Sequence, residues 1–169
     1  ASSGNRKTQE AVNAMTPLRV YVDSSVFGGC FDEEFEDESR RFFEQVKAGR
    51  ILVLISQVVV DELADAPASV QQVLASLPLE AIETVELTSE VIGLRDEYIR
   101  AGIVTPKFLD DATHVAAATA VRADAIVSWN FRHIVRIDKM RAYNAVNLRE
   151  GYGLLSIVSP RELQTDEDE

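Results

Sequence analysis

Carboxylate side chains occur at three places where the local sequence has no simple structural need of them. Asp23 ends an apolar run in the stretch RVYVDSSVF. Glu62 lies in QVVVDELADA, beyond the first helical turn, in which the helix dipole would favour an acid. Asp110 and Asp111 open the alanine-rich stretch FLDDATHVAAATAV, although aspartate is a poor residue for a helix interior. These acids are candidates for chemistry.

Carboxylates that are brought together repel one another and raise one another's pKa values. They stay ionised together most readily around a hard cation, and Mg²⁺ and Mn²⁺ suit oxygen ligands. The 2 histidines and 1 cysteine of the chain argue against a zinc site. The residue types therefore predict a carboxylate site for Mg²⁺ or Mn²⁺, provided that the fold brings the acids together.

Each acid also has an ordinary structural interpretation. Asp23 is a good N-cap for a following helix, a position that Ser24 or Ser25 would fill equally well. Glu62 taken alone fits a solvated helix face, and its neighbour Asp61 competes with it for an inward position. The order of the elements has to decide between these interpretations.

Short apolar runs alternate along the chain with helical patterns. Strands are expected at 19–22, 51–55, 81–85, 125–128 and 154–158, with 81–85 at an edge of the sheet. Helices are expected at 39–48, 57–66, 69–77, 89–100, 107–122 and 137–147, with Ser56, Thr88 and Thr105 as N-caps. This alternation predicts an α/β protein, a three-layer α/β/α sandwich with a central, mostly parallel five-stranded sheet.

Parallel sheets of this kind bind ligands outside the carboxyl ends of their strands. Asp23 falls at such an end. Asn130, in the stretch AIVSWNFRHI, is a polar residue at the same kind of strand end. Asp111 and His114 are three residues apart and therefore share one face of their helix.

The 169 residues are expected to form a single domain over 15–163, starting at Met15. Positions 1–14 are interpreted as a tag or disordered leader, and 164–169 as a disordered acidic tail. The net charge of −11 counts against a non-specific nucleic-acid-binding module, but not against an enzyme that meets phosphates through divalent cations. The single cysteine, Cys30, and the lack of a long apolar run predict a cytoplasmic protein without a membrane span.

The motifs VDSSVF, ISQVVVDELA and FLDDATHVAAATAVRADAIVSWN, in this order, resemble a PIN domain, the nuclease fold of the VapC-like toxins of prokaryotic toxin–antitoxin systems. The resemblance covers roughly 18–158. It implies a metal-dependent endoribonuclease that hydrolyses RNA phosphodiester bonds. By position, Asp23, Glu62 and Asp111 match the family's metal-binding acids.

Asn130 falls where the family usually has a fourth acid. An amide is neutral and weakens cation binding relative to a carboxylate, although its carbonyl oxygen is still able to ligate a metal or hold a metal-bound water. The resemblance also suggests accessory roles for Ser24 and Ser25 near the metal, and Asp110 lies beside Asp111.

Several further residues have both a functional and a structural interpretation. His114 and His133 are either donors to a phosphate or ordinary structural histidines. Lys107, Arg132 and Arg136 are either phosphate contacts or solvated surface. Trp129 is more easily explained as a core residue than as a platform for an RNA base.

Two kinds of protein partner are implied by the resemblance. A toxin of this family acts with a protein antitoxin, and a homodimer is expected, with a helical surface that includes Phe42 and Phe43 unless those rings belong to the core. Alternatives to the enzyme remain. One is a catalytically silent PIN-like module that works by binding a partner. Another is a phosphoacceptor protein of the receiver or haloacid-dehalogenase type, which the sequence DSS at 23–25 argues against.

Overall fold

The strands form one sheet, as the alternating pattern predicts. The computed structural model describes residues 16–163; the leader, Met15 and the acidic tail lie outside these residues. Within 16–163 the sheet has five strands in the order β3-β2-β1-β4-β5, and every neighbouring pair is parallel. The strands are β1 (Leu18–Val22), β2 (Ile51–Ser56), β3 (Ile82–Val85), β4 (Ala125–Val127) and β5 (Ser156–Val158). The predicted edge position of the weak third strand is confirmed.

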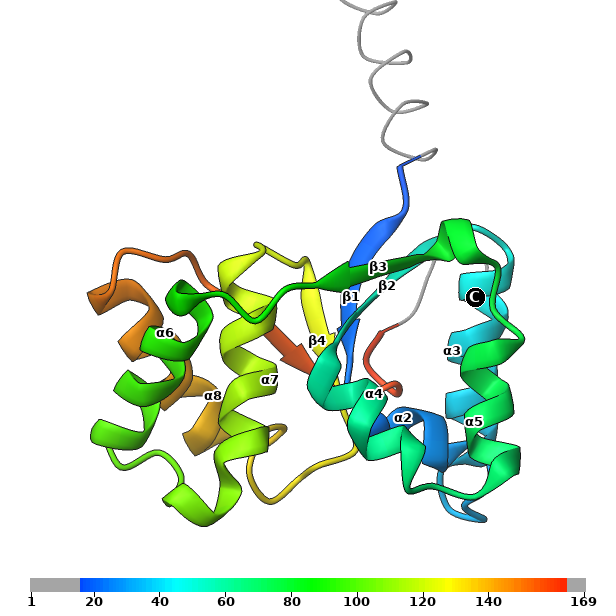
Figure 1. Cartoon of the computed structure of the whole chain (residues 1–169), viewed down its shortest axis with the longest axis horizontal. Coiled ribbons are helices and arrows are strands. Elements are labelled where there is room, and N and C mark those ends of the chain that lie inside the picture. The colour runs from blue at the N-terminus through cyan, green and yellow to red at the C-terminus, as the bar shows by residue number, and fades with distance from the viewer. Residues whose placement is uncertain (1–15, 164–169) are drawn as a thin grey trace, which may run out of the picture.

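Helices cover both faces of this sheet, which confirms the three-layer α/β/α architecture (Figure 1). One layer contains α2 (Ser24–Gly29), α3 (Glu36–Lys47) and α5 (Ala68–Ala75). The other contains α6 (Ser89–Arg100), α7 (Leu109–Ala120) and α8 (Ile137–Arg149). The short α4 (Gln57–Ala64) follows β2 directly. Two 3₁₀ turns, η1 (Leu79–Ala81) and η2 (Pro106–Phe108), precede β3 and α7.

The connections reverse direction between β1 and β4. From β1 the chain passes to β2 and then β3, whereas the return through α6 and α7 places β4 on the other side of β1. The backbone N–H of Asp23 bonds to the carbonyl of Val127 at 3.4 Å, which carries the β1–β4 pairing to the end of both strands. A reversal of this kind opens a crevice at the carboxyl ends of the two central strands, the usual ligand site of an open α/β sheet.

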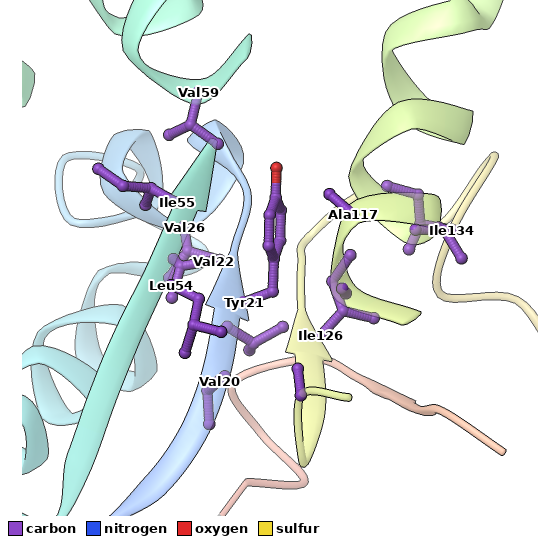
Figure 2. Packing of buried hydrophobic residues seen from close by; sticks show 14 of the residues in the cluster. Val20, Tyr21, Val22, Val26, Leu54, Ile55, Val59, Ala117, Ile126 and Ile134 are labelled. Carbon is purple, nitrogen blue, oxygen red and sulfur yellow. The ribbon is translucent and has the colours of Figure 1, made fainter. Parts of the chain in front are cut away.

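The central strands are buried on both faces, as their continuous apolar sequences predict. Val20, Tyr21 and Val22 of β1 have no solvent exposure. Figure 2 shows the Tyr21 ring between Val59 and Ala117, with its hydroxyl oxygen at the far end from the strand. The small alanines of α7 allow this helix to pack closely on the sheet. Across the described residues, no helix is long and apolar enough to span a membrane.

The start of α7 differs from the sequence-based expectation. Thr105 precedes η2, not α7, and its side chain forms no capping hydrogen bond. Because α7 begins only at Leu109, Asp110 and Asp111 lie in its first turn, where the helix dipole favours acids. The prediction that Thr105 caps a helix that begins at residue 107, with both aspartates in its interior, was therefore wrong. Thr88 does cap α6 and accepts a bond from the N–H of Val91 at 3.3 Å.

Candidate active site

Asp23 lies at the crevice between the ends of β1 and β4, and its side chain ties the two strands together. It caps α2 by accepting from the N–H of Ser25 at 3.2 Å, and it also accepts from the Ser25 hydroxyl. Its second oxygen accepts from the Ser128 hydroxyl at 2.8 Å. The hydroxyl of Ser25 in turn accepts from the N–H of Trp129 at 2.9 Å. Asp23 is thus both the N-cap and a member of the site.

Burial raises the pKa of Asp23, whose side chain is almost inaccessible to solvent. The nearby His114 and the hydrogen bonds from Ser25 and Ser128 oppose this shift, whereas the charge of Glu62 adds to it. These neighbours therefore stabilise the ionised form against the effect of burial. A bound cation would favour the ionised form further.

Asp111 faces the same crevice from the first turn of α7. It is half-buried, and burial raises the pKa of its carboxyl, with a smaller upward contribution from Glu62. His133, His114 and a hydrogen bond from the Asn130 side chain act in the opposite direction. Asp111 therefore lies within electrostatic reach of residues from α4, α7 and the loop after β4.

Asn130 is used within its own loop. Its side-chain oxygen accepts from the backbone N–H groups of Arg132, at 3.2 Å, and His133, at 2.9 Å. Because an amide oxygen has two lone pairs, both are engaged, and the amide nitrogen is left to meet Asp111. In this geometry Asn130 orients the loop and one carboxylate and does not offer a free oxygen ligand.

Glu62, and not Asp61, points toward the acidic cluster. Oε1 of Glu62 lies 2.7 Å from Nε2 of His114. Asp61 is exposed and accepts a hydrogen bond from Gln57, one turn earlier on α4, at 2.7 Å. Of the two acids that competed for this position, the inward one is therefore Glu62.

His114 connects Glu62 to a buried hydrogen-bonded chain. Nδ1 of His114 lies 2.8 Å from the Tyr21 hydroxyl, which lies 2.7 Å from the hydroxyl of Ser56. Ser56 precedes α4 as predicted, but its side chain makes no capping bond because it is engaged with Tyr21. The role of Tyr21 was missed in the sequence. The available signal was a phenol in a strand buried on both faces, which needs a polar partner.

The pKa of His114 is raised by its carboxylate neighbours, although burial acts to lower it. The hydrogen bond to Glu62 and the charges of Asp23, Glu62 and Asp111 outweigh the burial. The protonated ring donates from both nitrogens, which fits Glu62 on one side and the Tyr21 oxygen on the other. When the ring is protonated, its positive charge partly balances the three acids.

The other predicted residues occupy different surroundings. Trp129 is buried, stacks on Phe35 with ring centroids 4.1 Å apart, and donates to the hydroxyl of Ser39 at 2.8 Å, so its predicted core role is confirmed. Asp110 is exposed beside Asp111, and Ser24 is half-buried at the start of α2. Burial lowers the pKa of His133, as do the charges of Arg132, Lys139 and Arg136.

The donor chemistry of the cluster fits a hard divalent cation, with carboxylate oxygens at the end of the crevice and two of these carboxyls raised in pKa. In residues 16–163, however, no three Asp, Glu, His or Cys side chains are close enough together to form a metal-binding group. Both oxygens of Asp23 accept from serines, and Glu62 is bound to His114.

Comparison with known proteins supports the fold. No protein-family model and no curated protein sequence matches the chain. Among solved structures, a chain of VapBC2 from Rickettsia felis, bound to a DNA fragment from their promoter, is similar with a TM-score of 0.51. The identity is 14%, and the match covers 68% of this chain and 90% of that one.

Two further solved structures are similar at lower scores. DNA-bound VapBC from Salmonella typhimurium has a TM-score of 0.48 and 21% identity, with coverage of 71% of this chain and 92% of that one. Tyrosyl-tRNA synthetase from Aeropyrum pernix has a TM-score of 0.47 and 12% identity, with coverage of 93% and 55%. The Rickettsia felis match and the sheet topology together confirm the predicted PIN-like α/β fold.

Proposed function

We propose that this protein is a metal-dependent endoribonuclease that hydrolyses RNA phosphodiester bonds. The observation that carries the proposal is that the charges of Asp23, Glu62 and Asp111 all act on the buried His114, which Glu62 contacts at 2.7 Å, at the point where the sheet reverses direction. Ionised acids in this arrangement repel one another, and a bound cation would offset that repulsion. The VapC-like fold agrees with a nuclease.

Asp23, Glu62 and Asp111 are the proposed ligands of Mg²⁺ or Mn²⁺. When bound, the cation would lower the pKa of a water molecule and stabilise the negative charge on phosphorus. Asp23 is held in place by Ser25 and Ser128, and Asp111 by the Asn130 amide, so both carboxylates are preoriented. Glu62 is positioned by His114. Because Mg²⁺ keeps several waters, two carboxylates are sufficient to begin binding.

The proposed protein partner follows from the similarity to VapBC chains. The proposed role is that of a toxin with a protein antitoxin, because the similar Rickettsia felis and Salmonella typhimurium chains come from VapBC assemblies. The free, buried thiol of Cys30 and the RNA substrate are consistent with a cytoplasmic location.

Phe42 and Phe43 are buried in the core, so of the two interpretations of these rings the core one holds, and a dimer needs another surface. The outer face of α8 exposes Ile137 and Leu148, at 67% and 57% of their accessible area, beside a shallow groove. Exposed apolar side chains of this size are typical of an interface, and we propose this face for the dimer.

Cleavage of a mixed RNA pool by wild type and by Asp23→Asn and Asp111→Asn, with Mn²⁺, Mg²⁺ or EDTA, tests the proposal. The expected result is metal-dependent cleavage that falls by on the order of 100-fold in either variant, since such a metal contributes several kcal/mol to the transition state. Asp110→Asn is the matched control, because Asp110 is the exposed neighbour of Asp111, and it should cleave like wild type. Equal cleavage by all four proteins would indicate a contaminating ribonuclease.

A catalytically silent module is the second candidate function. It is favoured by the engagement of Glu62 with His114 and by the absence of a three-residue metal-binding group in 16–163. Such a protein would act by binding a partner at the same crevice. Folded wild-type protein that cleaves no RNA with either metal would support this candidate over the enzyme.

A further inference from the structure

Three basic side chains surround the ring of Phe108, beside the acidic cluster. The imidazole of His133 lies over this ring, with centroids 3.9 Å apart. Nζ of Lys107 is 5.6 Å and Cζ of Arg132 is 5.8 Å from the ring centroid. We call Lys107, Phe108, Arg132 and His133 the basic clamp. It stands out in a chain whose net charge is −11.

The two cations of the basic clamp are available to an external anion. Lys107 and Arg132 are exposed, and neither forms an ion pair with a carboxylate in residues 16–163. The neighbouring cations are engaged: Arg136 pairs with Asp138 at 2.8 Å, and Lys139 donates to the carbonyl of Ile103. Lys107 and Arg132 therefore carry positive charges that no acid within residues 16–163 neutralises by an ion pair.

The basic clamp is fixed in position relative to the acidic cluster. The Asn130 oxygen accepts from the N–H groups of Arg132 and His133, and the Asn130 side chain lies near enough to Asp111 to lower the pKa of its carboxyl. On the far side, the Tyr143 hydroxyl donates to the carbonyl of His133 at 2.9 Å. One amide thus links the loop that carries two clamp residues to a carboxylate of the site.

We propose that Lys107, Arg132 and His133 bind a phosphate group of RNA adjacent to the one that is cleaved. This inference rests on the proposed ribonuclease function. Asp23, Glu62 and Asp111 repel an RNA backbone, so a positive site beside them is needed to hold the strand across the crevice. Arginine presents parallel donors to phosphate oxygens, and lysine adds a point charge. Contacts of this kind position a strand without reading its sequence.

The salt dependence of RNA binding tests the clamp without requiring cleavage. A labelled single-stranded RNA of mixed sequence is titrated in EDTA at several salt concentrations with wild type, Lys107→Ala and Arg132→Ala. Each lost phosphate contact is expected to weaken binding and to reduce the slope of log K against log salt by about 0.7. Lys47→Ala is the matched control. Lys47 is exposed and ends α3 just before β2 begins, so it lies at the end of the sheet away from the carboxyl ends of the strands.

The outcomes separate the clamp from the nuclease. RNA binding with the expected slope changes, but no cleavage with Mn²⁺ or Mg²⁺, would support the clamp and contradict the ribonuclease. Metal-dependent cleavage with unchanged slopes in both clamp variants would overturn the clamp alone. Failure of the wild type to bind RNA, or an equal effect of Lys47→Ala, would also overturn it.

Discussion

His114 Nε2 lies 2.7 Å from Glu62 Oε1, and this contact joins a buried helix position to an acid on a different helix. The histidine is almost fully buried, and its other nitrogen meets the Tyr21 hydroxyl. The chain from Ser56 through Tyr21 and His114 to Glu62 thus runs from the end of β2 to the acidic cluster. This hydrogen-bonded chain explains why Glu62, and not Asp61, points toward the acidic cluster.

Replacement of His114 by leucine should destabilise the protein. The Tyr21 hydroxyl and Glu62 would each lose a partner, and a buried polar group left unsatisfied costs about 1–3 kcal/mol. Urea unfolding of wild type and His114→Leu measures the difference. His133→Leu is the control, since His133 is only half-buried and its loss should have a smaller effect. Equal stability of His114→Leu and wild type would contradict the hydrogen-bonded chain.

The raised pKa of His114 predicts a dependence of stability on pH. An unfolded histidine has a pKa of about 6.5, and the folded value lies above it. The folded protein therefore binds the proton more tightly, so this contribution is fully present below pH 6.5 and is lost as pH rises through the folded pKa. One proton gives a slope of at most about 1.4 kcal/mol per pH unit.

Comparison with His114→Gln tests this contribution. The glutamine amide can still donate to Glu62 but does not titrate, and the loss of the histidine also removes its lowering effect on the pKa values of Asp23 and Asp111. The free energy of unfolding of wild type relative to His114→Gln should fall as pH rises from 6.5 through the folded pKa of His114. A difference that stays constant with pH, or grows, would show that the pKa of His114 is not raised.

The sequence predicted the helices and strands but not the polar contacts between them. Alternating apolar runs located all five strands of the described sheet, and the strand end placed Asp23 at the carboxyl edge. The start of α7 was misplaced because Pro106 begins a separate 3₁₀ turn, which a proline near a helix start does not distinguish from the helix itself. Helix boundaries depend on such local competition.

Local sequence patterns did not predict the contacts between residues far apart in the chain. Ser56 fits an N-cap by its position, but its hydroxyl prefers Tyr21, which lies 35 residues away in the chain. The two interpretations of Asp23, as a cap and as a site residue, turned out to be compatible, because its two oxygens serve different partners. Spacing alone does not reveal which partner a side chain meets across the sheet.

Gly29 should not tolerate a side chain. A Cβ at this position would lie 2.7 Å from Nε1 of Trp129 and would also meet the hydroxyl of Ser39. These two groups are hydrogen-bonded to each other, so neither moves freely. Gly29→Ala is expected to destabilise the protein by about 1–3 kcal/mol, the usual cost of overpacking a core.

Gly28 provides the matched control in the same helix. A Cβ at Gly28 has no atom within 4 Å, so Gly28→Ala should be neutral or stabilise by up to about 1 kcal/mol through reduced backbone entropy. Thermal and urea unfolding of both variants compares them directly. If Gly29→Ala were as stable as Gly28→Ala, the close contact between α2 and Trp129 would be absent in solution.

Replacement of Asn130 by aspartate separates its two roles. Aspartate keeps an oxygen acceptor for the N–H groups of Arg132 and His133, but it replaces the donor to Asp111 with a like charge. A like charge raises the pKa of Asp111 further, while a fourth carboxylate attracts a divalent cation more strongly. Asn130→Asp should therefore bind Mn²⁺ more tightly than wild type. In EDTA it should bind RNA more weakly than wild type, because the added charge repels phosphate.

Alanine at position 130 gives the opposite combination. Asn130→Ala releases the N–H groups of Arg132 and His133, so the basic clamp loses its fixed position, but no charge is added. RNA affinity should fall, whereas Mn²⁺ affinity should not rise. Calorimetric titration with Mn²⁺ and RNA binding in EDTA measure the two properties for both variants. Weaker Mn²⁺ binding by Asn130→Ala would mean that Asn130 is itself a ligand and that its oxygen leaves the loop when the cation binds. Weaker Mn²⁺ binding by Asn130→Asp would contradict the gain expected from a fourth carboxylate.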